Sequence, residues 1–182
     1  LLNDILLIGR AEAGKMEFNP APLNLEQFCQ ELVEEMQLSA GSNHQLVFKL
    51  GKGKEPHVLP IAQSFPCVDE KLLRGILNNL LSNAIKYSVS GGSIYLKLFY
   101  QDRYAVFQVE DRGIGIPKED REHLFKPFHR AKNIGTISGT GLGLAIVKRS
   151  VELHGGKITF KSKISVGTRF TVTLPCYSNC KL

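Results

Sequence analysis

Two pairs of short alternating segments, each closed by a tight connection, limit the possible folds of this chain more than any other feature. Residues 93–100 and 104–111 alternate apolar and polar side chains across a short polar turn. A second pair is predicted at about 157–163 and 168–174. Strands joined by such short turns run antiparallel. The chain is therefore expected to build a largely antiparallel sheet, and its apolar face has to be covered.

Helices predicted from the hydrophobic periodicity can cover that face. This periodicity predicts a helix ending near Ala40, a long helix that Asp69 can cap and that runs to about Tyr87, and a helix from about Gly141 to His154. Smaller elements are expected as a strand at 45–50 and a short helix after Pro117. The predicted fold is α/β: a two-layer sandwich with a mixed, mainly antiparallel sheet and helices on one face.

Composition is typical of one globular domain. Of the 182 residues, 43% are hydrophobic and 22% are charged, which excludes a disordered chain. The net charge is +6, but no run of five like charges occurs, so we expect no nucleic-acid partner. No signal peptide is visible, and no apolar stretch approaches the roughly 20 residues that cross a bilayer.

Four segments are expected along the chain. Residues 1–14 space apolar or small side chains as in a coiled-coil seam, but for only about two heptads, too few for stability alone. A proline-containing linker follows at 15–23, the main domain at 24–175 and a tail at 176–182. Because the sequence opens within a helical pattern, we expect it to be part of a longer protein whose membrane anchor, if present, lies outside this sequence.

The four cysteines have neither zinc-ligand spacing nor the density of a disulfide scaffold. We therefore expect free thiols in a reducing cytoplasm, with Cys176 and Cys180 close enough in the tail to pair adventitiously. This predicts a cytoplasmic domain.

The long helix changes character along one stripe. Leu72 and Ile76 are followed at helical spacing by Asn79, Asn83 and Tyr87, with a lysine at 86. Carboxamide oxygens suit a hard cation such as Mg²⁺, and a lysine with a tyrosine suits phosphate oxygens. The alternative is a solvated helix end or a hydrogen-bonded core asparagine.

A carboxylate ends the apolar face of the strand at 104–111. Asp111 is costly there unless donors meet it. Gly113 and Gly115 follow, and they allow the backbone to approach a flat ligand closely. An ordinary Asp-Gly turn is the alternative.

A glycine-rich window at 135–143 runs directly into a helix. Backbone amides at such a helix start can hold phosphate, although a flexible linker is the alternative. The spacing fits neither a Walker motif nor a dinucleotide fingerprint. Arg130 and Lys132, just upstream, either close on phosphates or are solvated charges.

Taken together, these segments resemble a known family. The boxes NLLSNAIKYS, DRGIGIP, LFKPFHR and GTGLGLAIVK, followed by HGG and GT, are similar in order and spacing to the catalytic ATP-binding domain of sensor histidine kinases, in the GHKL superfamily. The resemblance covers about 24–175. Residues 1–14 resemble the end of a dimerisation and phosphoacceptor hairpin.

The resemblance implies a role for each matched residue. Asn83 would bind Mg²⁺ that bridges the ATP phosphates, with Asn79 and Lys86 beside it as the other catalytic residues, and Asp111 would accept a hydrogen bond from the adenine amino group. Phe125 and Phe128 would anchor the lid at 129–140. The full set expected at the nucleotide is Asn79, Asn83, Lys86, Tyr87, Asp111, Gly113, Gly115, Ile116, Arg130, Gly139, Thr140, Gly141, Leu142, Gly143 and Leu144.

Two departures stand out. Arg112 replaces the family's usual asparagine. The acceptor histidine, which an acidic residue follows in this family, is missing: none of the five histidines has that context. The chain is thus expected to bind ATP and ADP, and to phosphorylate a hairpin histidine outside it for relay to a response-regulator receiver domain. A homodimer is expected for the full-length protein and a monomer for this fragment.

Two other functions remain open at this point. A nucleotide-sensing docking module without catalysis is suggested by Arg112 and the missing acceptor. A GHKL-type ATPase clamp is the other, but such enzymes carry a glutamate where Asn79 stands, and a carboxamide cannot take a proton from water.

Overall fold

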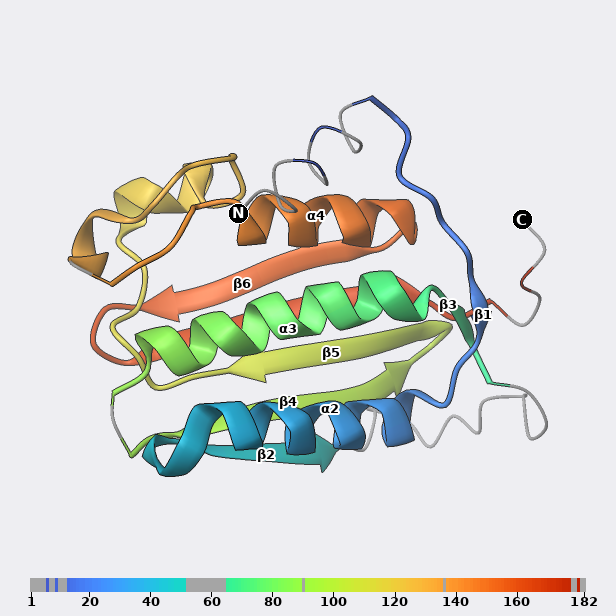
Figure 1. Cartoon of the computed structure of the whole chain (residues 1–182), viewed down its shortest axis with the longest axis horizontal. Helices are drawn as coiled ribbons and strands as arrows, with labels where there is room; N and C mark the ends of the chain where they lie inside the picture. Colours follow the sequence, from blue (N-terminus) through green and yellow to red (C-terminus); the bar gives the residue numbers. More distant parts are fainter. Residues whose placement is uncertain are drawn as a thin grey trace.

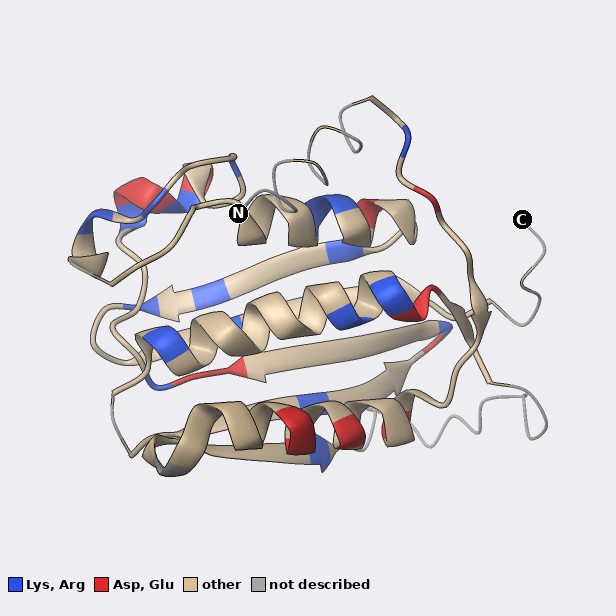
Figure 2. Ribbon diagram, viewed as in Figure 1, with Lys and Arg blue, Asp and Glu red and all other residues tan. Residues whose placement is uncertain are grey.

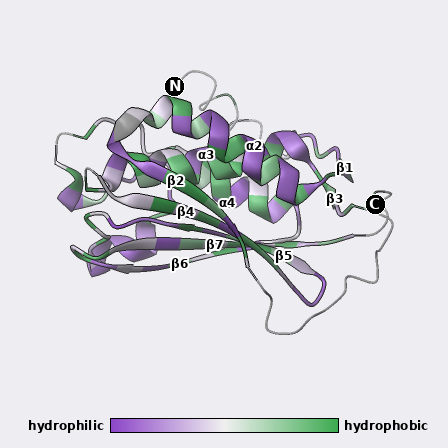
Figure 3. Ribbon diagram, turned by 90° about the horizontal axis from the view of Figure 1, so that it is seen from below, coloured by the Kyte–Doolittle hydropathy of each residue, from purple (hydrophilic) through white to green (hydrophobic). Residues whose placement is uncertain are grey.

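The computed structural model describes residues 6, 9, 13–51, 65–89, 91–135, 137–177 and 180. Three helices form one layer, and a five-stranded sheet forms the other (Figures 1 and 3). The helices cover one face of the sheet, so the predicted two-layer α/β sandwich is confirmed. The expected seam at 1–14 lies mostly outside the described residues.

The sheet has the order β2-β4-β5-β7-β6. Both predicted hairpins are present, β4 with β5 and β6 with β7, and β5 joins them by pairing with β7. β2 runs parallel to β4, which makes the sheet mixed. The strands are β2 Gln45–Leu50, β4 Ser93–Gln101, β5 Tyr104–Glu110, β6 Lys157–Lys163 and β7 Gly167–Pro175.

Three helices pack on this sheet: α2 Leu25–Ala40, α3 Glu70–Tyr87 and α4 Gly143–Leu153. Short 3-10 helices are η1 Gly41–Asn43, η2 Lys118–His123 and η3 Lys132–Ile134. Helix α4 begins two residues later than predicted, because Gly141 has a φ of +73°, which is outside the helical region. Acidic residues gather on α2, whereas Lys and Arg are spread over α3, α4, β6 and the segment before α4 (Figure 2).

The core lies between the layers. Helix α3 contributes Leu73, Ile76 and Leu77 to this core, all fully buried, and the sheet contributes Leu96 and Phe107 among others. Burying each such side chain stabilises the fold by roughly 1.5–3 kcal/mol, and together these side chains hold α3 against the sheet. Within the described residues, none of the helices has the length and apolar character that a membrane crossing needs.

The linker is more ordered than a linker prediction suggests. Two of its residues form β1 (Ala21–Pro22), which pairs antiparallel with β3 (Cys67–Val68) just before α3. The backbone N–H of Asn19 also donates to the Asp69 carboxylate at 2.8 Å. These contacts fasten the incoming chain to the first turn of α3 (Figure 1).

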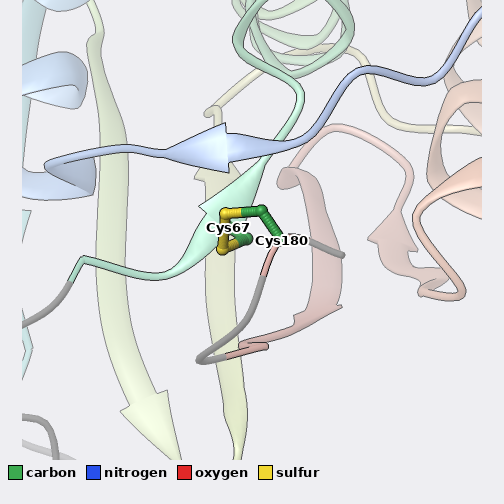
Figure 4. Close-up of a disulfide and its surroundings, with 2 residues drawn as sticks. All are labelled: Cys67 and Cys180. Carbon is green, nitrogen blue, oxygen red and sulfur yellow. A yellow bond between two sulfur atoms is a disulfide. The ribbon is translucent and has the colours of Figure 1, made fainter. Parts of the chain in front are cut away.

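The expectation of free thiols is wrong at two positions. Cys67 and Cys180 are joined in a disulfide across a sequence separation of 113 residues (Figure 4). The cause is the C-terminal segment, which folds back against β3, with the Cys67 N–H donating to the Tyr177 carbonyl at 3.1 Å. Sequence spacing could not reveal this contact. Cys29 and Cys176 are free thiols, and burial raises the pKa of each, to about 12 and about 11.

Candidate nucleotide-binding site

A cavity of about 190 Å³ lies at the C-terminal end of α3. Its walls come from α3, the end of β5 with the loop after it, the segment before α4, and β7. Thirteen of the fifteen residues expected at the nucleotide line it: Asn79, Asn83, Lys86, Tyr87, Asp111, Gly115, Ile116, Arg130, Gly139, Thr140, Gly141, Gly143 and Leu144. Segments far apart in the sequence thus meet in one place.

The α3 stripe faces this cavity. The Asn79 amide donates to the Gly75 carbonyl at 2.9 Å, and its Oδ1 points at the first residue of α4. A Cβ on Gly143 would overlap that oxygen, so only glycine lets α4 start so close to α3. Burial raises the pKa of Tyr87, partly offset by the Arg130 charge, so its hydroxyl stays protonated as a donor.

Asp111 lies at the buried side of the cavity and is 9% exposed. Its Oδ1 accepts from the backbone N–H of Gly113 at 2.8 Å and of Thr168 at 3.2 Å. The donors that its position requires therefore come largely from the protein itself. Within the described parts of the chain both bonds end on Oδ1, which leaves Oδ2 for a donor in the cavity.

Burial also changes the acidity of this carboxyl group. It raises the pKa of Asp111 to about 6, an effect that the two backbone hydrogen bonds reduce and that nearby Glu110 increases. The group is thus a carboxylate at neutral pH, but it takes up a proton at mildly acidic pH.

Gly113 and Leu142 do not line the cavity, and they support it instead. A Cβ on Gly113 would overlap the Tyr87 carbonyl oxygen, so this glycine lets the loop after β5 close on the end of α3. Leu142 is fully buried beneath the start of α4. Gly115 does line the cavity and has a φ of +70°, which favours glycine.

The described residues of the expected lid, 129–135 and 137–140, contribute several side chains to the cavity lining. The Arg130 guanidinium donates to the Ile137 carbonyl, so in this state it bonds to the lid itself. Gly141 has to be glycine, because a Cβ there would lie 2.7 Å from the Phe128 carbonyl carbon.

The two phenylalanines expected to anchor the lid differ. Phe125 is partly buried and packs edge-on against Phe160 with ring centroids 6.0 Å apart. Phe128 is 66% exposed with a φ of +61°, so its anchoring role was wrongly predicted. The tight approach of Gly141 forces the backbone at 128 into this turn, and the turn points the ring outward.

Sequence reasoning missed nine lining residues. They are Ser82, Ile114, Leu124, His129, Ala131, Asn133, Ile134, Thr168 and Phe170. Eight of them had an available signal: Ser82, Ile114, Leu124, His129 and Thr168 lie in recognised boxes, and Ala131, Asn133 and Ile134 lie in the expected lid. Phe170 carries no such signal, because a cavity wall and a core face have the same side chains.

The lining residues suit an adenine nucleotide. The lining combines a buried acceptor, Asp111, and apolar side chains with the cations Lys86 and Arg130. Asp111 is the one acidic residue in the described lining, so phosphates would meet little repulsion. Mg²⁺ uses few protein ligands when phosphates and water complete its octahedron, and the carboxamide of Asn83 meets that need.

Comparison with known proteins gives a consistent result. Residues 68–178 match the family model described as "Histidine kinase-, DNA gyrase B-, and HSP90-like ATPase". The chain is 37% identical over 178 residues to the circadian input-output histidine kinase CikA of Synechococcus elongatus, covering 96% of this chain and 23% of that protein. It is 32% identical over 184 residues to the sensor histidine kinase WalK of Bacillus subtilis, covering 96% and 28%. The chain thus spans about a quarter of these relatives.

Solved structures agree. Full-length ShkA in complex with AMPPNP has a TM-score of 0.77 and 26% identity, covering 98% of this chain and 36% of that one. The mycobacterial sensor histidine kinase MprB has a TM-score of 0.70 and 25% identity, covering 88% and 99%. The resemblance drawn from the sequence boxes is confirmed: the chain belongs to the histidine kinase-, DNA gyrase B- and HSP90-like ATPase family, as an ATP-binding domain of the sensor histidine kinase type.

Proposed function

We propose that this domain binds ATP with Mg²⁺ and donates the γ-phosphoryl group to a histidine on a dimerisation and phosphoacceptor hairpin, for relay to an aspartate of a response-regulator receiver domain. One observation carries the proposal. A buried carboxylate, Asp111, lines the same cavity as Asn83, Lys86 and Arg130, so one cavity holds an acceptor for the base and a metal ligand and two cations for the phosphates of an adenine nucleotide. The AMPPNP-bound relative of the same fold supports it.

Each group has a distinct task. Asp111 Oδ2 accepts from the adenine amino group, and the loop at Gly115 lies against the base. Lys86 and Arg130 neutralise phosphate charge, and backbone amides before α4 hold the phosphate oxygens. Mg²⁺, held by Asn83, would supply further charge neutralisation and orientation of the phosphates.

Transfer is favoured over hydrolysis. Asn79 cannot act as a base toward water, and its amide is already bonded to the Gly75 carbonyl. Positioning and charge neutralisation, which dominate phosphoryl transfer, need no such base. The acceptor's imidazole nitrogen attacks the γ-phosphorus, a P–N bond forms as the P–O bond to ADP breaks, and ADP leaves. The ATPase clamp is therefore not favoured.

The cavity volume adds one requirement. At about 190 Å³ it is smaller than the roughly 300–1,000 Å³ usual for ligand pockets. The lid tip, held by Arg130 at Ile137, has to move outward to admit a triphosphate. In doing so it frees the guanidinium for the phosphates.

The test combines this domain, MgATP and the separately made acceptor hairpin of the parent protein. Acid-labile phosphohistidine on the hairpin is the expected product, with Asn83→Ala as the variant that should prevent its formation. Absence of phosphohistidine despite normal nucleotide binding would refute the kinase proposal. Rapid ATP turnover by the domain alone would favour the ATPase instead.

A further inference from the structure

A buried carboxylate outside the site described above lies at the base of the lid. Asp120 belongs to η2 and is 3% exposed. A buried carboxylate is costly unless partners compensate it. The partners of Asp120 therefore indicate which segment its carboxylate holds in place.

Both oxygens of Asp120 face the first part of the lid. Oδ2 accepts from the backbone N–H of Lys132 at 2.9 Å. Oδ1 lies 3.5 Å from Nε2 of His129. The carboxylate thus bonds to the chain after Arg130 and contacts the residue directly before it.

A second contact fastens the same part of the lid. The Asn133 side chain donates to the Gly115 carbonyl at 2.9 Å, which links the lid to the loop that faces the base. The N-terminal part of the lid is therefore hydrogen-bonded at 132 and 133, and it contacts Asp120 at 129. Arg130 projects from this attached part and reaches the Ile137 carbonyl farther along.

We propose that Asp120 is a positioning residue for recognition of the terminal phosphate: by bonding to the Lys132 N–H on one side of Arg130 and contacting the His129 ring on the other, its carboxylate aims the guanidinium at the γ-phosphate. The inference rests on the proposed function and deepens it. Asp120 itself does not line the cavity, so it acts through Arg130. Its loss should weaken binding of a triphosphate much more than binding of a diphosphate.

The experiment measures affinities of AMPPNP and ADP, each with Mg²⁺, by calorimetry. Asp120→Ala should weaken AMPPNP binding about tenfold and ADP binding less than about twofold, since tenfold corresponds to one charge-assisted contact of about 1.4 kcal/mol. Asp120→Asn keeps an oxygen acceptor for the Lys132 amide and should recover most of the loss. In an Arg130→Gln background, Asp120→Ala should cause no further loss of AMPPNP affinity.

A second variant tests the hydrogen bond without removing the buried carboxylate. Lys132→Pro deletes the N–H donor at the first residue of η3, where proline fits, and Ala131 before it is already extended with φ −63° and ψ 146°. Lys132→Ala is the matched control, because it removes the side chain and keeps the N–H. Selectivity for AMPPNP over ADP should be at least about fivefold lower for the proline variant than for the alanine variant.

Three outcomes would overturn the inference. They are equal loss of ADP and AMPPNP affinity in Asp120→Ala, losses that add to those of Arg130→Gln, and equal selectivity of the two Lys132 variants. Failure of the proposed function is distinguishable: a domain that is no nucleotide-binding domain would bind neither nucleotide in its unaltered form, and a domain that binds nucleotide but transfers no phosphoryl group would form no phosphohistidine while these affinities stay as expected.

Discussion

The two ends of α3 are built for different purposes. At its start, Asp69 caps the helix by accepting from the Leu72 N–H at 3.0 Å, and its other oxygen accepts from the Asn19 N–H. Its own N–H donates to Nε2 of His154 at 3.3 Å. Burial lowers the pKa of His154, so the imidazole is neutral and can accept there. The buried polar groups of Asp69 and His154 thus have protein partners.

The other end leaves polar groups directed at a cavity. Asn83, Lys86 and Tyr87 line it, and Asp111 opposite keeps one oxygen for an incoming donor. Both ends belong to one rigid, buried helix, so the difference is not one of packing. The comparison indicates that polar groups directed at a cavity mark the binding site, whereas polar groups bonded to one another within the protein mark the anchored end.

The largest expected effect breaks the anchored end. Cys180→Ser removes the disulfide to Cys67, two residues before Asp69, and should lower the free energy of unfolding by about 2–4 kcal/mol. Denaturant unfolding without reductant measures it. Cys176→Ser, which alters a free thiol, is the matched control. Reductant should bring the unaltered protein to the level of Cys180→Ser, whereas equal stability of all three would contradict the link.

Breaking the site end should affect binding instead. Asp111→Asn keeps Oδ1 for its two backbone donors and places an N–H₂ where Oδ2 faces the cavity. ADP affinity should fall by about 1–3 kcal/mol, the scale of a lost hydrogen bond to a charged group, with little change in unfolding. Calorimetry with ADP and a thermal melt separate the two effects. Unchanged ADP affinity would show that this carboxylate does not read adenine.

The pKa of Asp111 provides a further test of the site end of α3. Burial raises the pKa of Asp111 from the ordinary aspartate value of 3.8 to about 6, so the folded state holds the proton more tightly. In the free protein its contribution to stability is therefore present at low pH and is lost as pH rises from about 4 to 6. Nucleotide affinity should move oppositely, because protonation removes the acceptor.

From pH 7.5 to pH 5, ADP affinity should fall about tenfold, since only about a tenth of the carboxyl remains ionised. The phosphates also titrate, so Asp111→Asn serves as the reference, and its affinity should lack this additional dependence. Parallel pH profiles for both proteins would refute the assignment.

The smallest effect concerns the cap at the anchored end. Asp69→Ala removes the acceptor for the Leu72 and Asn19 amides and should destabilise the fold by about 0.5–2 kcal/mol. Affinity for ADP should not change once the protein is folded. Asp69→Asn, which keeps an acceptor, should lie between. A large drop in affinity would mean that the two ends of α3 are not separable.

The fold was largely predictable because its signals are local. Alternation in the two hairpins and the cap at Asp69 depend on neighbours in sequence, and the structure confirms them. The disulfide and the pairing of β1 with β3 were not predictable. Each joins segments distant in sequence through short contacts that leave no periodic pattern.

The site was predictable where chemistry conflicts with position. A carboxylate at the end of an apolar strand and carboxamides on a helix stripe both contradict a plain core, and both line the cavity. Residues that obey the core pattern, such as Ile114 and Phe170, were missed. Asp120 was missed too, because a lone acid in a polar segment resembles a solvated charge until its burial is known.

The pairing of the linker with β3 has a geometric consequence. A helix advances about 1.5 Å per residue, so Asn83 lies roughly 20 Å along α3 from the point where Asn19 is fastened to Asp69. Under the proposed function, an acceptor histidine upstream of residues 1–14 on the same polypeptide would have to pass back along about four turns of α3 to meet a γ-phosphate held near Asn83. The attachment of the linker to α3 would thereby set the minimum length of the segment that connects such an acceptor to this domain.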